Sequence, residues 1–122
     1  MAQRYTFLGW NDTAMAAFGT SAYKLWDAGV TSGRVAYLRS IIITETGGTA
    51  GILYLYDYNT EGANPTVTTQ RATIYCPASC TTMVDFPAPG LKFVTGILGA
   101  LAVAPGAAIG TYCVTVSGYE EG

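Results

Sequence analysis

Few residues in this chain of 122 can carry out acid–base or nucleophilic chemistry. There is no histidine, so the most common general base and metal ligand is missing. The groups that remain are three cysteines and eight carboxylates: Cys76, Cys80, Cys113, Asp12, Asp27, Glu45, Asp57, Glu61, Asp85, Glu120 and Glu121. Two distant carboxylates can in principle form a pair of the kind that glycosidases use. However, most of them stand at expected strand ends, in loops or at the end of the chain. We therefore interpret them as solvated charges and predict that the chain is not an enzyme.

The cysteines and one acidic loop give only weak indications of a metal. Cys76 and Cys80 form a C-x3-C pair with Cys113 far away in the sequence, which leaves a zinc site one ligand short. We interpret the cysteines as buried small hydrophobes, with a Cys76–Cys80 disulfide formed after release from the cell as the alternative. Residues 57–62 alternate oxygen-bearing side chains as calcium loops do, but no acid stands at the twelfth position. We predict no metal and no cofactor.

The composition excludes several classes of protein. Charged residues make up 11% of the chain, against about a quarter of a typical soluble domain. Half of the residues are apolar, which argues against disorder, and the six Lys and Arg are scattered along an acidic chain, which argues against nucleic acid. Residues 96–110 carry no charge, but Pro105 interrupts a stretch already too short to span a bilayer. The N-terminus shows no signal-peptide pattern. We expect synthesis in a cytoplasm and no membrane partner.

From residue 34 onward, the sequence is typical of short strands separated by turns. Apolar and polar residues alternate, and turn formers such as Gly47-Gly48 and Pro105-Gly106 separate the runs. The predicted strands cover residues 35–46, 51–58, 66–76, 81–86, 91–94, 97–103 and 111–119. This spacing predicts an all-β fold, an antiparallel β-sandwich or barrel, over residues 34–122. We interpret residues 1–33 as an N-terminal arm or edge segment with a short helix over residues 14–18.

Three surfaces are candidates for binding. Tyr54, Tyr56 and Tyr58 alternate along one strand, so they share one face, where they pack on each other, contact another subunit or stack on sugar rings; of these we favour packing or a subunit contact. The uncharged stretch 96–110 lies either in the core or under a symmetry mate. The N-terminal segment holds large apolar side chains that need something to pack against: Tyr5, Phe7, Leu8, Trp10, Phe18, Tyr23 and Trp26.

Five features of the sequence after residue 34 form a pattern: YLRSIII at 37–43, GILYLYD at 51–57, Phe86 before Pro-rich turns, GLKFVTG at 90–96, and VTV at 114–116 with an aromatic close at Tyr119. Together they resemble small β-sandwich structural proteins of tailed-phage virions. The resemblance covers about residues 34–119, and residues 1–33 have no counterpart in it. It implies a jelly-roll or immunoglobulin-like sandwich that decorates or cements capsids, often as a trimer.

On this basis we predict a non-enzymatic capsid decoration or cement protein located in the virion, homotrimeric and bound to the major capsid protein. The alternative is a fibre or receptor-binding module that recognises carbohydrate, with Tyr54, Tyr56 and Tyr58 as the stacking platform. The predicted interface residues are Tyr5, Phe7, Trp10, Phe18, Trp26, Tyr54, Tyr56 and Tyr58.

Overall fold

The computed structural model describes residues 3–11, 23–26, 29–60, 67–103 and 112–122, and it shows an all-β protein. The predicted helix over residues 14–18 lies outside these ranges. The elements are β1 (Arg4–Asn11), β2 (Tyr23–Lys24), β3 (Val35–Glu45), β4 (Gly51–Tyr56), a 3-10 turn (Val67–Thr69), β5 (Gln70–Cys76), β6 (Thr81–Asp85), β7 (Leu91–Phe93), β8 (Leu98–Val103) and β9 (Tyr112–Glu121). No helix in the described ranges is long and apolar enough to cross a membrane.

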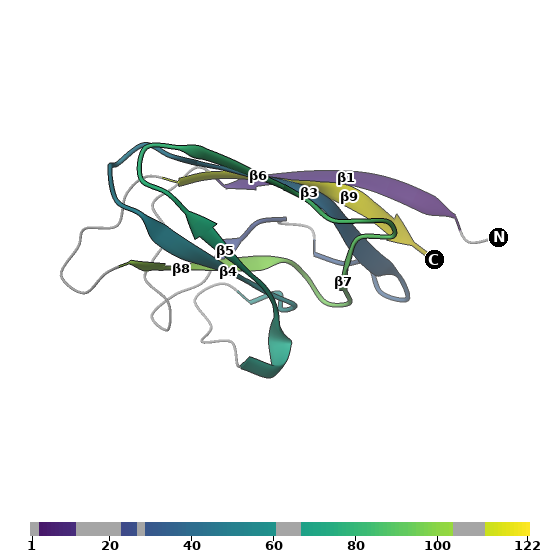
Figure 1. Ribbon diagram of the computed structural model, residues 1–122. Helices are drawn as coiled ribbons and strands as arrows, with labels where there is room; N and C mark the ends of the chain where they lie inside the picture. Colours follow the sequence, from purple (N-terminus) through teal and green to yellow (C-terminus); the bar gives the residue numbers. More distant parts are fainter. Residues whose placement is uncertain (1–2, 12–22, 27–28, 61–66, 104–111) are drawn as a thin grey trace.

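The strands form two antiparallel sheets that lie one above the other (Figure 1). The large sheet has the order β1-β9-β3-β6, with β7 also paired to β3, and the small sheet has the order β2-β8-β4-β5. Strands from the two halves of the chain pair in a nested way: β1 with β9, β2 with β8, β3 with β6, and β4 with β5. These pairs alternate between the two sheets, which is the topology of a jelly roll. The sequence prediction of a jelly-roll-like antiparallel sandwich is confirmed.

The core lies between the sheets and follows from the alternation of side chains along each strand. In β3, Ala36 and Leu38 are buried, and after an irregularity between Leu38 and Ser40 the buried positions become Ile41 and Ile43. A β-bulge has this effect because one extra residue reverses which side chains face inward. Side chains of the small sheet meet them from the other side: Leu53, Leu55, Ile74 and Leu101.

The seven strands predicted after residue 34 are present, with shifted ends. The largest difference is at β5, which begins at Gln70 instead of residue 66, because residues 67–69 form a 3-10 turn. The carbonyl oxygen of Thr69 accepts a hydrogen bond from the backbone N–H of Asp57 at 2.8 Å, so this turn is tied to the end of β4. β4 ends at Tyr56 and not at residue 58, again next to an irregularity in pairing.

Within the segment 1–33, which the sequence analysis interpreted as an arm or edge segment, the described residues include a strand that it did not predict, β1 at the edge of the large sheet. β1 pairs with β9 over its whole length, from Arg4 opposite Glu121 to Asn11 opposite Val114. A Cβ at Gly9 would collide with the backbone of Leu25, so glycine is required for β1 to pass over this part of the chain. Leu25 and Trp26 belong to the core. A division of the chain at residue 33 stays a prediction.

The uncharged stretch that begins at residue 96 has an internal explanation in its described part, residues 96–103. β8 lies between β2 and β4 in the small sheet and is therefore not an edge strand. Residues 96–101 are all buried, and Leu98 and Ala100 alternate with Gly99 and Leu101 between its two faces. Burial within the chain accounts for the lack of charge here without a symmetry mate.

Candidate functional site

Three of the carboxylates are buried, so their interpretation as solvated charges was wrong. Glu45 is 2% exposed, Asp57 7% and Glu120 5%. Each accepts hydrogen bonds from the backbone of a neighbouring loop, which supplies the compensation that a buried charge requires. We call these three residues the loop carboxylates. Each one binds a different segment of the chain, as described in turn below.

Glu45 ends β3 and joins two loops. Its Oε1 atom accepts hydrogen bonds from the backbone N–H of Thr49 at 2.7 Å and of Ser79 at 3.1 Å, and Oε2 accepts one from the N–H of Gly47. Thr49 belongs to the β3–β4 connection and Ser79 to the β5–β6 connection. One carboxylate therefore fixes both connections at the same end of the sandwich.

These contacts change the pKa of Glu45. Burial raises the pKa, but hydrogen bonds from the backbone of Ser79 and of residues 47–49 lower it by more, so that the pKa lies below its ordinary value of 4.5. Tyr112 lies nearby, opposite Glu45 in the β3–β9 pair, and its hydroxyl donates to the carbonyl oxygen of Thr49 at 2.8 Å. Burial raises the pKa of Tyr112 to about 12, with smaller contributions from Cys76 and Glu45. This end of the sandwich is stabilised by the ionised form of Glu45 and the neutral form of Tyr112.

Asp57 follows β4 and holds the loop between β7 and β8. Its Oδ1 atom accepts from the N–H groups of Val94 at 3.0 Å, Thr95 at 2.7 Å and Gly96 at 3.3 Å. Oδ2 accepts from Val94 at 3.0 Å and forms an ion pair with Arg71 at 3.3 Å. Three successive N–H groups directed at one anion form a nest. Donors surround both oxygens, so Asp57 is not arranged as a calcium ligand; residues 61 and 62 of the acidic loop lie outside the described ranges.

Glu120 lies in β9 and holds the segment that precedes β3. Its Oε2 atom accepts from the backbone N–H of Thr31 at 2.8 Å, and Oε1 accepts from the Thr31 hydroxyl at 3.1 Å. The three loop carboxylates therefore each bind a different segment of the chain. In the described ranges, no group of three His, Cys, Asp or Glu residues could hold a metal. That the chain is not an enzyme stays a prediction.

The cysteines are reduced thiols in three different environments. Cys76 is buried, as expected for a small hydrophobe, and burial raises its pKa to about 11. Cys113 is half-buried, whereas Cys80 is exposed in the β5–β6 connection. The interpretation of the cysteines as buried hydrophobes is therefore confirmed for Cys76 and wrong for Cys80.

The tyrosine row is divided by burial. Tyr54 and Tyr56 share the outward face of the small sheet, with ring centroids 6.4 Å apart. Tyr56 is fully buried against Leu98 and Ala100, and burial raises its pKa to about 12. Tyr58, beyond the end of β4, is 38% exposed. Tyr56 is thus a packing residue and offers no ring face to a ligand. Interface roles for Tyr54 and Tyr58 stay predictions.

The N-terminal aromatics have partners inside the chain where the structure describes them. Phe7 in β1 stacks on Trp26 with ring centroids 4.1 Å apart and an interplanar angle of 12°, and Trp26 is only 9% exposed. The Arg34 guanidinium lies 3.6 Å from the ring centroid of the half-buried Tyr5. Trp10 belongs to β1, and Phe18 lies outside the described ranges. Contacts of any of these residues with another chain stay predictions.

The sequence analysis missed the most exposed large apolar side chains, Tyr75 at 64% and Met83 at 63%. Tyr75 lies in β5, an outer strand of the small sheet, and Met83 lies in β6, an outer strand of the large sheet. Both stand at outward positions of alternating strands: Tyr75 follows exposed Arg71 and Thr73 in β5, and Met83 lies between exposed Thr81 and Asp85 in β6. A large apolar residue on the polar side of an alternating strand is the signal that could have identified them.

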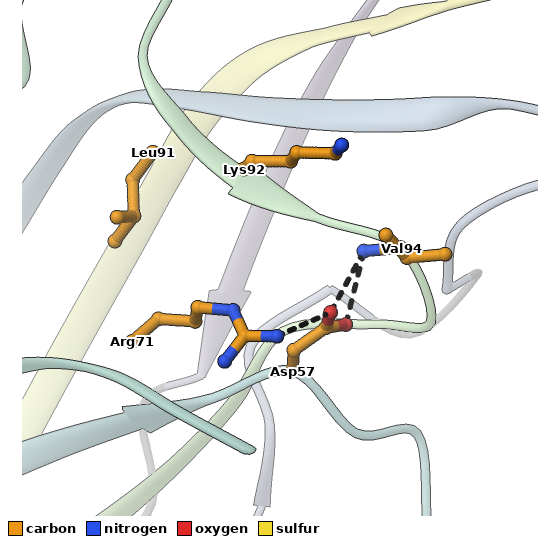
Figure 2. A pocket seen from close by; sticks show the side chains of 5 residues that line it. All are labelled: Asp57, Arg71, Leu91, Lys92 and Val94. Atoms are coloured by element: carbon orange, nitrogen blue, oxygen red, sulfur yellow. Dashed lines mark hydrogen bonds and ion pairs between the residues drawn. The ribbon is translucent and has the colours of Figure 1, made fainter. Parts of the chain in front are cut away.

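A pocket of about 290 Å³ lies between β5 and β7 (Figure 2). Its lining residues are Asp57, Arg71, Leu91, Lys92 and Val94. Arg71 belongs to β5, and Leu91 and Lys92 to β7, so the pocket lies where an outer strand of each sheet comes together. Figure 2 shows Arg71 and Asp57 on one side of it and Leu91 and Lys92 on the other.

Comparison with known proteins yields matches in structure only. No protein-family model matches the chain, and no curated protein matches it in sequence. Among solved structures, it is similar to a chain of the virus-like particle of extra small virus from the prawn Macrobrachium rosenbergii, at 12% identity over 98% of this chain and 80% of that one, with a TM-score of 0.41. The Tobacco streak virus coat protein matches at 11% identity over 93% and 85%, with a TM-score of 0.46. A chain of the cyanophage Pam1 capsid matches at 15% identity over 97% and 85%, with a TM-score of 0.42. A likeness at this level says nothing about function.

Proposed function

We propose that this chain is a structural protein of a virion that acts as a capsid decoration or cement protein. The observation that carries the proposal is the open side of the jelly roll formed by β5, β6 and β7. Two strongly exposed apolar side chains, Tyr75 and Met83, stand there on outer strands. The coat and capsid proteins named above belong to the same broad class, but the proposal is argued from this chain alone.

The open side has little of the protection that outer strands of monomeric proteins carry. Such strands are protected by charges, prolines, bulges or covering loops, because their unpaired backbone groups pair readily with another chain. The only charged residue of β5 is Arg71, and the only one of β6 is Asp85. Tyr75 lies on the outer face of the small sheet and Met83 on the outer face of the large sheet, so contacts that cover these edges from both faces would bury them.

The loop carboxylates are a second observation that supports a structural role in a virion. Glu45, Asp57 and Glu120 use their charges inside the fold to hold loops in place, through the backbone hydrogen bonds described above. A part that must match a neighbouring surface gains from loops that are fixed before binding, because less conformational entropy is lost on association. These three charges thus stabilise the positions of loops.

The finer parts of the proposal concern assembly. We infer a homotrimer, because a symmetric cluster multiplies weak contacts through avidity, and the major capsid protein as partner on the outside of the shell. Residues 1–33 are proposed to form an edge segment of the same unit. Tyr5, Trp10 and Phe18 remain its candidate contacts with other chains.

Cosedimentation of the purified full chain with isolated capsid shells tests this function. We expect the wild-type protein to cosediment, and the double variant Tyr75→Ser/Met83→Ser to bind at least about tenfold more weakly, since buried anchors of this kind contribute most of the energy of an interface. The variant Thr73→Ser, at an exposed position of β5, is the matched control. Failure of the wild-type protein to bind shells would remove the decoration role. Equal binding by the double variant would remove the open side as the contact.

The second candidate is a fibre or receptor-binding module that recognises carbohydrate. Accessible Tyr58 and half-buried Tyr54 favour it, although the burial of Tyr56 removes the middle ring of the platform. A glycan array probed with the full chain decides between the candidates. Binding that is lost in Tyr54→Ala/Tyr58→Ala would establish the carbohydrate function, and an array without binding would exclude it.

A further inference from the structure

The described residues that line the pocket between β5 and β7 have a net positive charge. Arg71 and Lys92 contribute two positive charges and Asp57 one negative charge, which leaves one positive charge in a chain whose net charge is −2. Asp57 is buried, and its oxygens accept the backbone N–H groups of residues 94–96. Its charge is therefore compensated before any ligand arrives, and it repels an incoming anion less than an open carboxylate would.

Arg71 retains donors that can bind a ligand. A guanidinium has five N–H donors. The hydrogen bonds within the chain use three of them, two on Nη1 to the carbonyl oxygens of Thr68 and Gln70 and one on Nη2 to Asp57. Five less three leaves two donors without a partner among the described residues, one on Nη2 and one on Nε. The Asp57 ion pair holds the guanidinium in place, so these donors are positioned in advance.

The other lining residues restrict the chemical class of ligand that the pocket can bind. Leu91 and Val94 supply apolar wall, and Val94 is 53% exposed. No aromatic ring belongs to the lining residues, so the pocket has no flat surface on which a sugar would stack. A volume of about 290 Å³ fits a side chain or another group of that size. A methylene stem that ends in a carboxylate matches both the apolar wall and the cationic groups.

We propose that this pocket binds the carboxylate of an acidic side chain, Asp or Glu, from a protein partner. Arg71 and Lys92 contact the carboxylate, while Val94 and Leu91 contact the methylene groups behind it. The pocket lies on the open side that also carries Tyr75 and Met83. An acidic residue of the partner would thus fix the position of a contact whose energy comes from apolar burial. The identity of the partner rests on the proposed function, whereas binding of the carboxylate does not.

Titration of the full chain with two small probes, followed by NMR, tests the site. The probes are N-acetyl-glutamate N-methylamide and its glutamine counterpart, which differ only in the charge. We expect the glutamate probe to shift the Arg71 Nε and Val94 resonances in a saturable way, and the glutamine probe to leave them unchanged. Raising the salt concentration should weaken the binding, since exposed ion pairs are screened.

Two variants locate the binding, and a third serves as control. Lys92→Gln and Arg71→Gln should each weaken binding of the glutamate probe about three- to tenfold, the range of exposed to charge-assisted pairs. Lys92 is exposed and forms no part of the Asp57 nest, so Lys92→Gln keeps the test valid if Arg71→Gln loosens that loop. Arg39→Gln, at an exposed position of β3, should bind as the wild type does.

Three results would overturn the proposal. They are equal shifts with the glutamate and glutamine probes, an equal loss in Arg39→Gln, and tighter binding of glucuronic acid than of the glutamate probe, which would assign the pocket to an acidic sugar. The assay contains no capsid shells. Failure here therefore leaves the cosedimentation result intact, and failure of cosedimentation leaves this one intact.

Discussion

The two sides of the sandwich differ in how exposed their large apolar side chains are. On the side of β1 and β2, Phe7 from the large sheet stacks on Trp26, which follows the outer strand of the small sheet, and Trp26 is buried. On the side of β5 and β6, Tyr75 and Met83 point outward and are about two-thirds exposed. The first side is closed by the chain itself. The second side leaves its large apolar side chains exposed, and for this reason the proposed function places the candidate interface there.

Trp26→Ala removes the buried ring from the side of β1 and β2. Of the variants considered, it should lower the free energy of unfolding the most. Removal of a buried Trp from a core costs about 3–5 kcal/mol, through lost burial and the cavity that remains. Urea denaturation followed by circular dichroism measures the change in the free energy of unfolding. Tyr75→Ala is the matched control on the open side and should change stability by less than about 0.5 kcal/mol. Equal losses in the two variants would show that the sides do not differ.

Asp57→Asn tests whether the loop between β7 and β8, beside the pocket, is stabilised by the hydrogen bonds from residues 94–96 to the Asp57 carboxylate. The variant keeps the shape but removes the charge, and hydrogen bonds to charged groups contribute about 1.5–3 kcal/mol. We expect the free energy of unfolding to fall by about 2 kcal/mol. We also expect hydrogen exchange at Val94, Thr95 and Gly96 to accelerate before exchange in the core strands does. Asp85→Asn, at an exposed position, serves as control, and unchanged exchange at these three amides would contradict the role of Asp57.

Glu45→Gln tests whether the ionised carboxylate of Glu45 stabilises the β3–β4 and β5–β6 connections. The test is the pH dependence of the free energy of unfolding. Because the pKa of Glu45 is lower in the folded protein than its ordinary value of 4.5, the unfolded chain binds this proton more readily. The stability that it contributes is fully present above pH 4.5 and is lost as the pH falls through the folded pKa. Denaturation curves between pH 6 and pH 3 should show a smaller loss in Glu45→Gln than in the wild type. Parallel curves would be inconsistent with the lowered pKa.

The double variant Tyr75→Ser/Met83→Ser sharpens the comparison with the smallest effect on folding. Both side chains are mostly exposed, so stability should change by less than about 0.5 kcal/mol. Any self-association of the free chain through the open side should weaken. Sedimentation velocity over a range of concentrations measures this. A self-associating wild type with an unchanged variant would place the contact elsewhere.

Most of the fold could be predicted from the sequence because it depends on local patterns. Alternation along β4 and β9 separates the side chains of one face from those of the other. β1 was missed because its residues are mixed in character and it is defined by pairing with β9, a strand more than a hundred residues away in the chain. The irregularity between Leu38 and Ser40 likewise arises from pairing and not from the local sequence.

The candidate site was predicted less well for a related reason. A carboxylate at a strand end looks solvated unless the positions of distant N–H groups are known. The donors to Asp57 come from residues 94–96, and those to Glu45 come partly from Ser79. In the same way, Phe7 looked unplaced because its stacking partner, Trp26, follows a strand of the other sheet. The missing signal was in both cases a contact between distant parts of the chain.

An electron cryomicroscopy reconstruction of the virion, with the chain fitted into its density, tests the central claim most directly. The proposed function predicts the jelly roll on the outside of the shell, with Tyr75 and Met83 of the open side buried against a neighbouring subunit. Absence of the chain from the particle, or an open side that faces solvent while another surface makes the contacts, would contradict it.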